Sequence, residues 1–454
     1  MYFRQFRIAD MGCASYMIGS DGECLVVDPQ WDVEPYLRVA KKEGLKITYI
    51  IDTHVHADHV SGNRRLAERT GANILLHSAS RAGYAYQKVE DGQVISIGKV
   101  RVAIMNTPGH TPESIMLKVT DLEQPDLPPY LLTGDTIFVG DVGRPDLAGT
   151  EGAVQLYQSL HQILPVLPTT SQIFPAHLAG SLCGRNLSTA HSSTLEVELR
   201  SNPALQIEDQ DKFVHYLMDD LPPKPADFER IIGINRQGAP ISQVVPKQLS
   251  PTQALELING QGCKLVDTRE PEQYWQKHVT PSLNVPVFSN QFGPNVINFI
   301  PPTTDLILVT DDEEDANEAV KLLAGVGRTN VKGYVLTGEA LAADSGFKLE
   351  KARQVETDDL RNRPVVDVRE TNEFESGTLE GALNLPLRSV NRPESLEKLR
   401  KLAGQTDFLV LICNNGQRSS IAASYLEEQG ITGRNLANGL ESVKETGAIL
   451  TPLA

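Results

Sequence analysis

The sequence has few cysteines, no long apolar run and a shortage of positive charge. Five cysteines are scattered over 454 residues, which does not suit the disulfide framework of a secreted protein. No apolar run reaches the roughly 18 residues that a membrane span needs, and the first residues, MYFRQFRIADMG, lack the apolar stretch of a secretory signal. The formal net charge of −16 argues against a nucleic-acid-binding surface. We therefore expect a soluble, cytoplasmic protein with reduced thiols and neither a membrane nor a nucleic-acid partner.

The length of the chain and its turn residues predict several domains. A chain of 454 residues is too long for a single core, and three domains are expected. Short β-branched runs alternate with turn signals up to about residue 225, for example CLVVDP at 24–29 and ITYIIDTH at 47–54. Prolines and glycines are then dense between Pro222 and Pro246, which predicts a linker over 226–246.

The sequence repeats itself after this linker. LVDTREPEQYWQKHVTPSLNVPV begins at Leu265, and VVDVRETNEFESGTLEGALNLPL begins at Val365, 100 residues later. Each repeat continues to a second apolar strand, LILVT at 306–310 and FLVLIC at 408–413, and then to a helix-like segment. Strands that alternate with helices in this way predict two small parallel sheets with helices on both faces, over 247–350 and 351–454.

Potential metal ligands gather in the first half of the chain. Four of them lie within the six residues of HVHADH, directly after the predicted strand ITYIIDT, and can converge if the chain turns sharply there. Three more each follow an apolar run, in TPGHTPES, LLTGDTIF and IFPAHLAG. Imidazole and carboxylate suit zinc, iron or manganese, and no thiolate is expected among the ligands. The sequence therefore predicts a catalytic metal site rather than structural histidines, with the candidate ligands His54, His56, Asp58, His59, His110, Asp135 and His177.

This ligand pattern resembles the metallo-β-lactamase superfamily, in which an HxHxDH loop, a later histidine, an aspartate and a final histidine occur in the same order. The resemblance implies an αββα sandwich over residues 1–225, with the metal site at one edge where the sheets meet. Two activities share these ligands. One is a binuclear thioester hydrolase of the glyoxalase II type, and the other is a mononuclear iron persulfide dioxygenase.

Three features favour the dioxygenase. GDVGRPDL at 140–147 resembles a Gly-Arg-x-Asp element of the dioxygenases, and GSLCG at 180–184 resembles bacterial dioxygenases that are fused to sulfurtransferases. The C-terminal half, in contrast, does not resemble the helical glutathione-binding domain of glyoxalase II. The resemblance thus implies that His54, His110 and Asp135 hold one Fe(II) per chain, with zinc as the alternative metal.

The resemblance also implies roles for the neighbouring side chains. Arg144 is a candidate to bind a carboxylate of the thiol carrier, because the guanidinium group can donate two parallel hydrogen bonds to a carboxylate. A structural salt bridge is the alternative. Cys183 is a candidate to hold a persulfide in transit, and simple packing in a loop is the alternative. The remaining candidates would orient the ligands or hold a second metal, and they are His56, Asp58, His59 and His177.

The second repeat contains a candidate sulfur site. Cys413 ends the strand FLVLI and precedes a polar loop and a helix, so that backbone N–H groups would surround the thiol and favour its anion. The repeat resembles the rhodanese sulfurtransferase family in its VxDxRxxxEF opening at 365–374 and in GALNLP at 381–386, although Thr378 stands where the family usually has histidine. The resemblance implies that Cys413 and Arg418 are catalytic. It also implies that the other loop residues bind the substrate, and these are Asn414, Asn415, Gly416, Gln417 and Ser419.

Two alternatives to sulfur transfer remain for this loop. A cysteine-dependent phosphatase carries five residues between Cys and Arg, whereas four separate Cys413 from Arg418 here, which favours sulfur over phosphate. A buried structural cysteine is the second alternative, and the polar character of the loop disfavours it. The first repeat has only acidic residues after its strand LILVT, from Asp311 to Asp315, and is therefore expected to be inactive.

Together the resemblances imply an α/β multidomain protein, in which the αββα sandwich is followed by an inactive and an active rhodanese-like domain. The expected reactants are a low-molecular-weight thiol persulfide, O2, sulfite and thiosulfate, as in sulfide detoxification, and the expected assembly is a homo-oligomer, a dimer or a tetramer. A glyoxalase II-like hydrolase with a rhodanese appendage is the alternative. The carrier thiol stays open among glutathione, coenzyme A, bacillithiol and cysteine.

Overall fold

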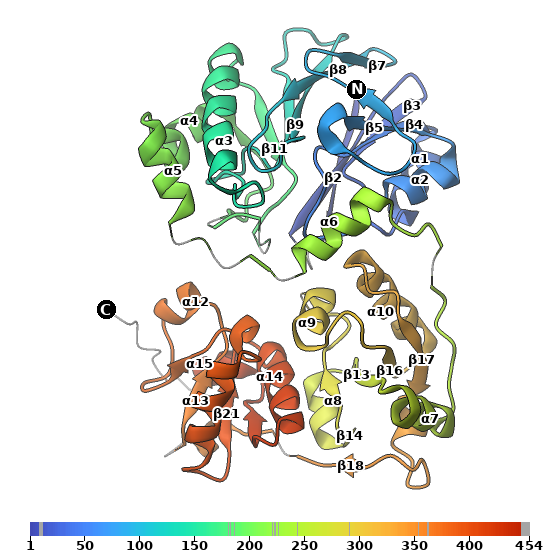
Figure 1. Ribbon diagram of the computed structural model, residues 1–454, viewed down its shortest axis with the longest axis vertical. Coiled ribbons are helices and arrows are strands. Elements are labelled where there is room, and N and C mark those ends of the chain that lie inside the picture. Colours follow the sequence, from blue (N-terminus) through green and yellow to red (C-terminus); the bar gives the residue numbers. More distant parts are fainter. Residues whose placement is uncertain are drawn as a thin grey trace. The chain divides into compact units, whose positions relative to one another are not determined.

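The computed structural model forms two compact units, Met1–Gln243 with Ala324–Gly327, and Val244–Leu323 with Arg328–Ala454 (Figure 1). Among the residues that the structure describes, no helix combines the length and the apolarity that a membrane crossing requires. The described residues are 1–8, 12–179, 181, 183–185, 187–219, 221, 224–225, 227–242, 244–289, 291–352, 354–360 and 363–445.

The first unit is built on two six-stranded sheets. One sheet contains, in spatial order, β1 (Tyr2–Ile8), β2 (Cys13–Ser20), β3 (Glu23–Val27), β4 (Lys46–Ile51), β5 (Asn73–His77) and β6 (Gln87–Val89). The other contains β12 (Ser193–Thr194), β11 (Gln172–Pro175), β10 (Tyr130–Gly134), β9 (Ile115–Asp121), β8 (Val100–Asn106) and β7 (Val94–Ile97). Alternate residues of the strands, such as Val100, Val102 and Ile104, enter one core with side chains of the first sheet, so the sheets pack face to face.

Helices cover the outer faces of both sheets. α1 (Glu34–Glu43) and α2 (Asn63–Thr70) share a core with the outward side chains of β2–β4, and α3 (Gly149–Ile163) and α5 (Gln210–Met218) share one with β9–β11. The result is the αββα layering that the sequence predicted. Short elements complete the unit: α4 (Leu195–Ser201), η1 (Ser78–Ser80), η2 (Leu164–Val166) and η3 (Pro203–Gln206).

The predicted linker over 226–246 differs from the structure. Helix α6 (Phe228–Gln237) occupies half of it and buries Phe228, Ile231 and Asn235. The prolines and the glycine that suggested a linker flank this helix rather than interrupt it, and Gly238 ends it with a φ of 96°. Pro222 and Pro223 lie outside the described residues.

The second unit holds the two predicted repeats, each with a four-stranded parallel sheet. The first has the order β15 (Leu283–Asn284), β13 (Lys264–Asp267), β16 (Leu306–Thr310) and β17 (Val331–Leu336). The second has the equivalent order β20 (Leu383–Asn384), β19 (Val365–Asp367), β21 (Leu409–Ile412) and β22 (Gly433–Asn435). The same topology in both sheets agrees with an internal duplication.

Short helices surround these sheets. The first repeat contains α7 (Pro251–Gln261), α8 (Pro271–Gln276), α9 (Phe292–Phe299), α10 (Glu313–Gly325) and α11 (Thr337–Ala340). The second contains α12 (Thr371–Glu375), α13 (Pro393–Ala403), α14 (Gln417–Glu428) and α15 (Gly439–Glu445). Minor elements are β14 (His278–Val279), β18 (Leu349–Glu350), η4 (Thr357–Leu360) and η5 (Leu387–Ser389).

Candidate functional site

The ligand loop starts where β4 ends, and a buried aspartate fixes its first turn. Asp28, which follows β3, accepts hydrogen bonds from the backbone N–H of Thr53 at 2.7 Å and from its hydroxyl at 2.9 Å. The carbonyl of Thr53 accepts a hydrogen bond from Ile115 N–H of the second sheet at 2.9 Å. The loop that begins at His54 is thus held against both sheets at one edge of the sandwich.

Three predicted ligands converge there in a buried triad. Nε2 of His110 lies 3.3 Å from Oδ2 of Asp135, and Nε2 of His54 lies 3.7 Å from the same oxygen. The three residues are at most 3% exposed, and none of these three atoms has a hydrogen-bond partner. Buried polar atoms without partners are costly, and one divalent cation would satisfy all three. The donor set therefore fits a metal, as two imidazoles and one carboxylate suit non-haem iron.

The other ring nitrogens of the triad histidines have partners. Nδ1 of His110 donates to the carbonyl of Arg144 at 2.8 Å, which leaves the lone pair on Nε2 available to a metal. Nδ1 of His54 lies 3.0 Å from the hydroxyl of Thr53. Burial, followed by the charge of His56, holds the pKa of His54 well below its usual range. His54 is therefore a neutral imidazole, the form that binds metals.

Asp135 provides the negative charge of the triad. Burial alone would raise the pKa of its carboxyl group, but the charge of His177 and the hydrogen bond with its ring outweigh burial and lower that pKa. Its second oxygen, Oδ1, lies 2.6 Å from Nδ1 of His177. The carboxylate is therefore ionised, and His177 holds the oxygen that does not face the triad.

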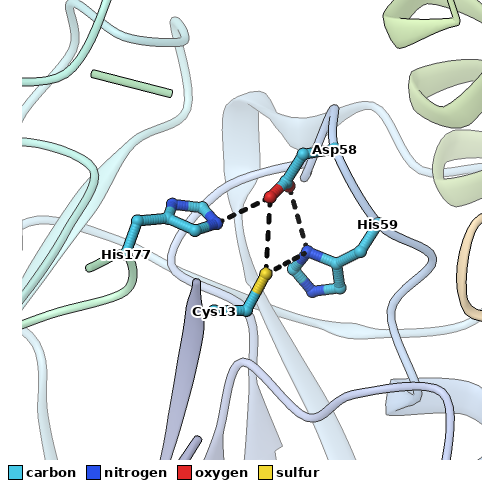
Figure 2. Close-up of side chains that lie close together, drawn as sticks. All are labelled: Cys13, Asp58, His59 and His177. Carbon is cyan, nitrogen blue, oxygen red and sulfur yellow. Dashed lines mark hydrogen bonds and ion pairs between the residues drawn. The ribbon is translucent and has the colours of Figure 1, made fainter. Parts of the chain in front are cut away.

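A second cluster of donors lies on the far side of His177 (Figure 2). Oδ2 of Asp58 is 2.7 Å from Nε2 of His177, and Oδ1 is 3.0 Å from Nδ1 of His59. Sγ of Cys13 is 3.5 Å from Asp58 Oδ2 and 3.8 Å from His59 Nδ1. One donor atom of each residue lies within 4.8 Å of the others, a spacing that could hold a second cation.

His56 lies between the two clusters, with its ring centroid 4.2 Å from those of His54 and His59. Its Nε2 lies 3.2 Å from Asp28 Oδ1, and it forms a third group of donors with Asp28 and Asp52. Burial first of all raises the pKa of Asp52 to about 6, while hydrogen bonds from Ser61 and Asn63 oppose this rise. His56 thus orients the loop through Asp28 in this structure rather than joining the triad.

Sequence reasoning missed two residues of the site. Cys13, at the start of β2, lies in the second donor cluster, and nothing in the sequence set it apart from the other cysteines. That no thiol binds the metal stays a prediction. Asn235, on α6, lay in the predicted linker. Its Nδ2 donates to the carbonyls of His56 and His59, both at 2.8 Å, and so fixes the shape of the ligand loop.

Arg144 forms the structural salt bridge that was the alternative to substrate binding, and its role in substrate binding stays a prediction. Its side chain is 2% exposed, and its guanidinium group binds Asp146, with Nε at 2.7 Å from Oδ1 and Nη2 at 2.8 Å from Oδ2. The guanidinium also lies over the ring of Phe228, 5.8 Å from its centroid. The geometry is that of the structural salt bridge, and the residue supports the metal site through its carbonyl, which accepts from His110.

Cys183 lies beside the metal ligands. Its sulfur belongs to a group of donors with Asp135 and His177, all within 4.8 Å of one another. It is fully buried and shares a small apolar cluster with Ala57, Phe138 and Phe228, and burial raises the pKa of its thiol. Its neighbours Gly180 and Leu182, in the GSLCG element, lie outside the described residues.

We expect Cys183→Ser to retain oxygen uptake within about 3-fold, because the apolar contacts indicate packing. The variant should lose about 1–3 kcal/mol of unfolding free energy, since a hydroxyl replaces a thiol in an apolar cluster. Oxygen-electrode rates and thermal unfolding measure the two effects. Cys24→Ser is the matched control, because Cys24 is equally buried but lies in another core cluster. A selective loss of uptake in iron-loaded Cys183→Ser would favour the relay.

The sulfur loop closes around Cys413 at the end of β21. The thiol accepts hydrogen bonds from Gly416 N–H at 3.2 Å and from the Ser419 hydroxyl at 3.3 Å. Gly416 has a φ of 90°, which glycine adopts without strain, and α14 begins at the next residue. The sulfur therefore faces the first turn of a helix, an arrangement that stabilises an anion.

Arg418 forms a bidentate ion pair with Glu373. Its Nη1 lies 2.6 Å from Oε2 of Glu373, and its Nη2 lies 2.8 Å from Oε1. Asn414 donates to Glu373 Oε1 at 3.0 Å, whereas Asn415 and Gln417 bond to each other at 3.2 Å in an exposed position. Glu373 thus balances the charge of Arg418, and the donors that contact the sulfur are Gly416 and Ser419.

The first repeat has no thiol at the equivalent position. Leu265 pairs with Ile307 in the first repeat as Val365 pairs with Val410 in the second, which places Thr310 where the second repeat has Cys413. The Thr310 hydroxyl donates to the carbonyl of Asp312 at 2.8 Å, within the acidic segment. This geometry agrees with the expectation of an inactive repeat.

Comparisons with known proteins divide the chain in the same way. The family model described as "Metallo-beta-lactamase superfamily" matches residues 9–177. The model described as "Rhodanese-like domain" matches residues 250–338 and 350–446. The crystal structure of a metallo-beta-lactamase from Staphylococcus aureus subsp. aureus COL is 31% identical with a TM-score of 0.66, and the match covers 74% of this chain and 98% of that chain.

Curated relatives of the first unit have two different activities. A hydroxyacylglutathione hydrolase of Polaromonas sp. (strain JS666 / ATCC BAA-500) is 35% identical over 159 residues, which are 34% of this chain and 57% of the hydrolase. The mitochondrial persulfide dioxygenase ETHE1 of Homo sapiens is 27% identical over 225 residues, which are 49% of this chain and 82% of the dioxygenase. The chain thus spans just over half the length of the hydrolase and most of the dioxygenase.

Proposed function

Because the chain belongs to the metallo-β-lactamase superfamily and carries two rhodanese-like domains after its metal domain, we propose that it is an iron-dependent persulfide dioxygenase joined to a sulfurtransferase. The observation that carries this proposal is the buried triad, in which His54 Nε2, His110 Nε2 and Asp135 Oδ2 converge without partners. A site of two histidines and one carboxylate leaves positions open for both substrates.

The first reaction converts a thiol persulfide, O2 and water into the free thiol and sulfite: RSSH + O2 + H2O gives RSH + H2SO3. The terminal sulfur is oxidised, O2 is reduced, and the S–S bond breaks. His54, His110 and Asp135 would hold the iron, which would supply the redox chemistry of this reaction when bound. The chain supplies two imidazoles, the ionised Asp135, and the hydrogen bonds of Thr53, Arg144 and His177 that hold these ligands in position.

The second reaction transfers sulfur at Cys413. A persulfide on this residue gives its outer sulfur to sulfite, so that Cys–S–S⁻ and SO3²⁻ become Cys–S⁻ and S2O3²⁻. The N–H of Gly416 and the hydroxyl of Ser419 stabilise the thiolate that leaves, since both already donate to Cys413. Sulfite from the first reaction is thus the acceptor in the second, which gives a reason for joining the two activities in one chain.

We expect protein purified without oxygen to contain one iron per chain. The triad offers one set of three partnerless ligand atoms, and His56 bonds to Asp28 instead of completing it. Metal analysis by mass spectrometry, together with oxygen uptake on several thiol persulfides, tests this expectation. Two zinc ions per chain without oxygen uptake would contradict it.

A thioester hydrolase is the second candidate, and the donor cluster of Cys13, Asp58, His59 and His177 favours it. This cluster meets the triad at the Asp135–His177 contact, so its four side chains would hold a second cation beside the first. The resemblance to hydroxyacylglutathione hydrolases points the same way. Hydrolysis of S-lactoylglutathione by the zinc-loaded chain would support this candidate over the dioxygenase.

A further inference from the structure

The first rhodanese-like repeat has lost its thiol but keeps a buried contact with the helix that follows the sulfur loop. Helix α14 starts four residues after Cys413 and lies beside α8 and α9 of the first repeat (Figure 1). Side chains of both repeats, Trp275 and Phe292 among them, form one apolar core with Cys413 and Ile421. The two repeats therefore fold as one body around this helix.

A chain of hydrogen bonds joins the first repeat to the start of α14. Nε1 of Trp275 donates to the Ser420 hydroxyl at 2.8 Å, and that hydroxyl donates to Oδ1 of Asn284 at 2.6 Å. Both hydrogen-bonding functions of the hydroxyl are thus used across the contact between the repeats. Trp275, Asn284 and Ser420 are at most 3% exposed, so water does not compete for these bonds.

Asn284 is itself fixed from three sides. Its Nδ2 donates to the carbonyls of Asp267 at 3.2 Å and Arg269 at 2.8 Å, and its backbone N–H donates to the Ser424 hydroxyl at 2.9 Å. Because Ser420 and Ser424 lie one turn apart, two successive turns of α14 are bonded to β15. Rotation or sliding of the helix would break both bonds together.

The contact is specific to the first repeat. At the position equivalent to Trp275, 100 residues further on, the second repeat has the exposed Glu375. Asn384, which is equivalent to Asn284, keeps its bonds to the carbonyls of Asp367 and Arg369 but is partly exposed. The first repeat, which has threonine in place of the loop thiol, thus provides the tryptophan, and the second repeat, which carries Cys413, provides the helix.

Ser420 is adjacent to a residue that contacts the reactive sulfur. Ser419 donates to Cys413 at 3.3 Å, and Gly416 at the start of the same helix donates at 3.2 Å. The first repeat also reaches the loop directly, because Gln417 donates to Glu270 at 3.3 Å. A shift of α14 would therefore move both donors away from the sulfur.

We propose that Trp275 and Asn284 of the first rhodanese-like repeat are positioning residues, which hold α14 so that its first turn stays aimed at the Cys413 sulfur. The inactive repeat is then a required part of the sulfur site and not a spacer. This inference rests on the proposed role of Cys413 as the sulfur carrier, and it acts through geometry alone, without a contact between the first repeat and the substrate.

Trp275→Phe in the full chain is the sharpest test, because phenylalanine keeps an aromatic ring and removes the N–H donor. We expect kcat for sulfur transfer from thiosulfate to cyanide to fall at least about 10-fold. KM for thiosulfate should change less than about 3-fold, because no substrate contact is lost. Alkylation of Cys413 by iodoacetamide, followed by mass spectrometry, should become slower and shift to higher pH.

Two further variants separate positioning from general stability. Ser420→Ala removes the same hydrogen bond from the other side, so the double variant should be no slower than the slower single variant. Lys264→Ala is the matched control, because Lys264 bonds to Glu428 at the far end of α14 in an exposed position. It should leave both kcat and the alkylation profile unchanged.

The outcomes distinguish this inference from the proposed function. Wild-type kcat and a wild-type alkylation profile in both Trp275→Phe and Ser420→Ala would overturn the positioning role. The same loss in Lys264→Ala would also overturn it, since the effect would then be one of interface stability. If the wild-type chain transfers no sulfur, the proposed transferase fails, and the alkylation profiles alone still decide whether the first repeat positions the thiol.

Discussion

Asp135→Ala should lose its iron and its oxygen uptake together. Asp135 is the only anionic member of the triad, and the neighbouring His177 keeps its carboxyl group ionised against the effect of burial. Without it two imidazoles remain for a divalent cation. Loss of a group that merely supports a ligand costs about 10–100-fold in metal affinity, so loss of the ligand itself should cost at least about 100-fold. Iron analysis after dialysis and oxygen-electrode rates measure both effects.

The Asp135→Asn variant tests whether iron binding requires the negative charge of Asp135 or only the size of its side chain. The amide nearly keeps the volume of the carboxylate, so a loss of iron in this variant comes from the lost charge and not from a cavity. Asp121→Asn is the matched control, since Asp121 pairs with the N-terminal ammonium group at 3.1 Å and with none of the site residues. Full oxygen uptake by an iron-free Asp135 variant would contradict the assignment of the ligand.

The layers and the repeats of this protein could be predicted because each leaves a local pattern. The strands of the first unit show alternating or continuous apolar runs, and the 100-residue repeat is visible in aligned motifs such as those at Asp267 and Asp367. Helix α6 could not be predicted with the same ease. Its flanking prolines and glycine indicate irregular backbone. The apolar face of the helix can be recognised only in the folded structure, where Asn235 on the helix contacts the ligand loop.

The candidate metal ligands were accessible to sequence reasoning because they follow strands at one edge of the sandwich. Cys13 also belongs to a strand at this edge, but its nearness to Asp58 and His177 depends on the pairing of β2 with distant segments. The pairing of Arg144 with Asp146 and of Arg418 with Glu373 is similarly invisible in a motif, which shows an arginine but not the carboxylate that occupies it. Sequence identifies reactive residues, whereas their partners depend on tertiary packing.

Cys413→Ser should abolish sulfur transfer and leave oxygen uptake intact. Serine forms no persulfide and has no accessible anion near neutral pH, so the loss should reach at least about 1,000-fold, as for other catalytic nucleophiles. The cradle itself should survive, because Gly416 N–H and Ser419 can donate to a hydroxyl as they do to the thiol. The assay is thiocyanate formation from thiosulfate and cyanide, with oxygen uptake measured on the same preparation.

The products should then show which step has been lost. With a persulfide substrate and O2, the Cys413→Ser chain should release sulfite where the wild-type chain releases thiosulfate, because sulfite no longer meets a sulfur carrier. Cys263→Ser is the matched control, since Cys263 is also a buried free cysteine and directly precedes strand β13 of the first repeat, outside the sulfur loop. Sulfur transfer at the wild-type rate would refute the role of Cys413. Loss of oxygen uptake in a fully iron-loaded variant would instead show that the oxidation of the persulfide depends on sulfur leaving through Cys413.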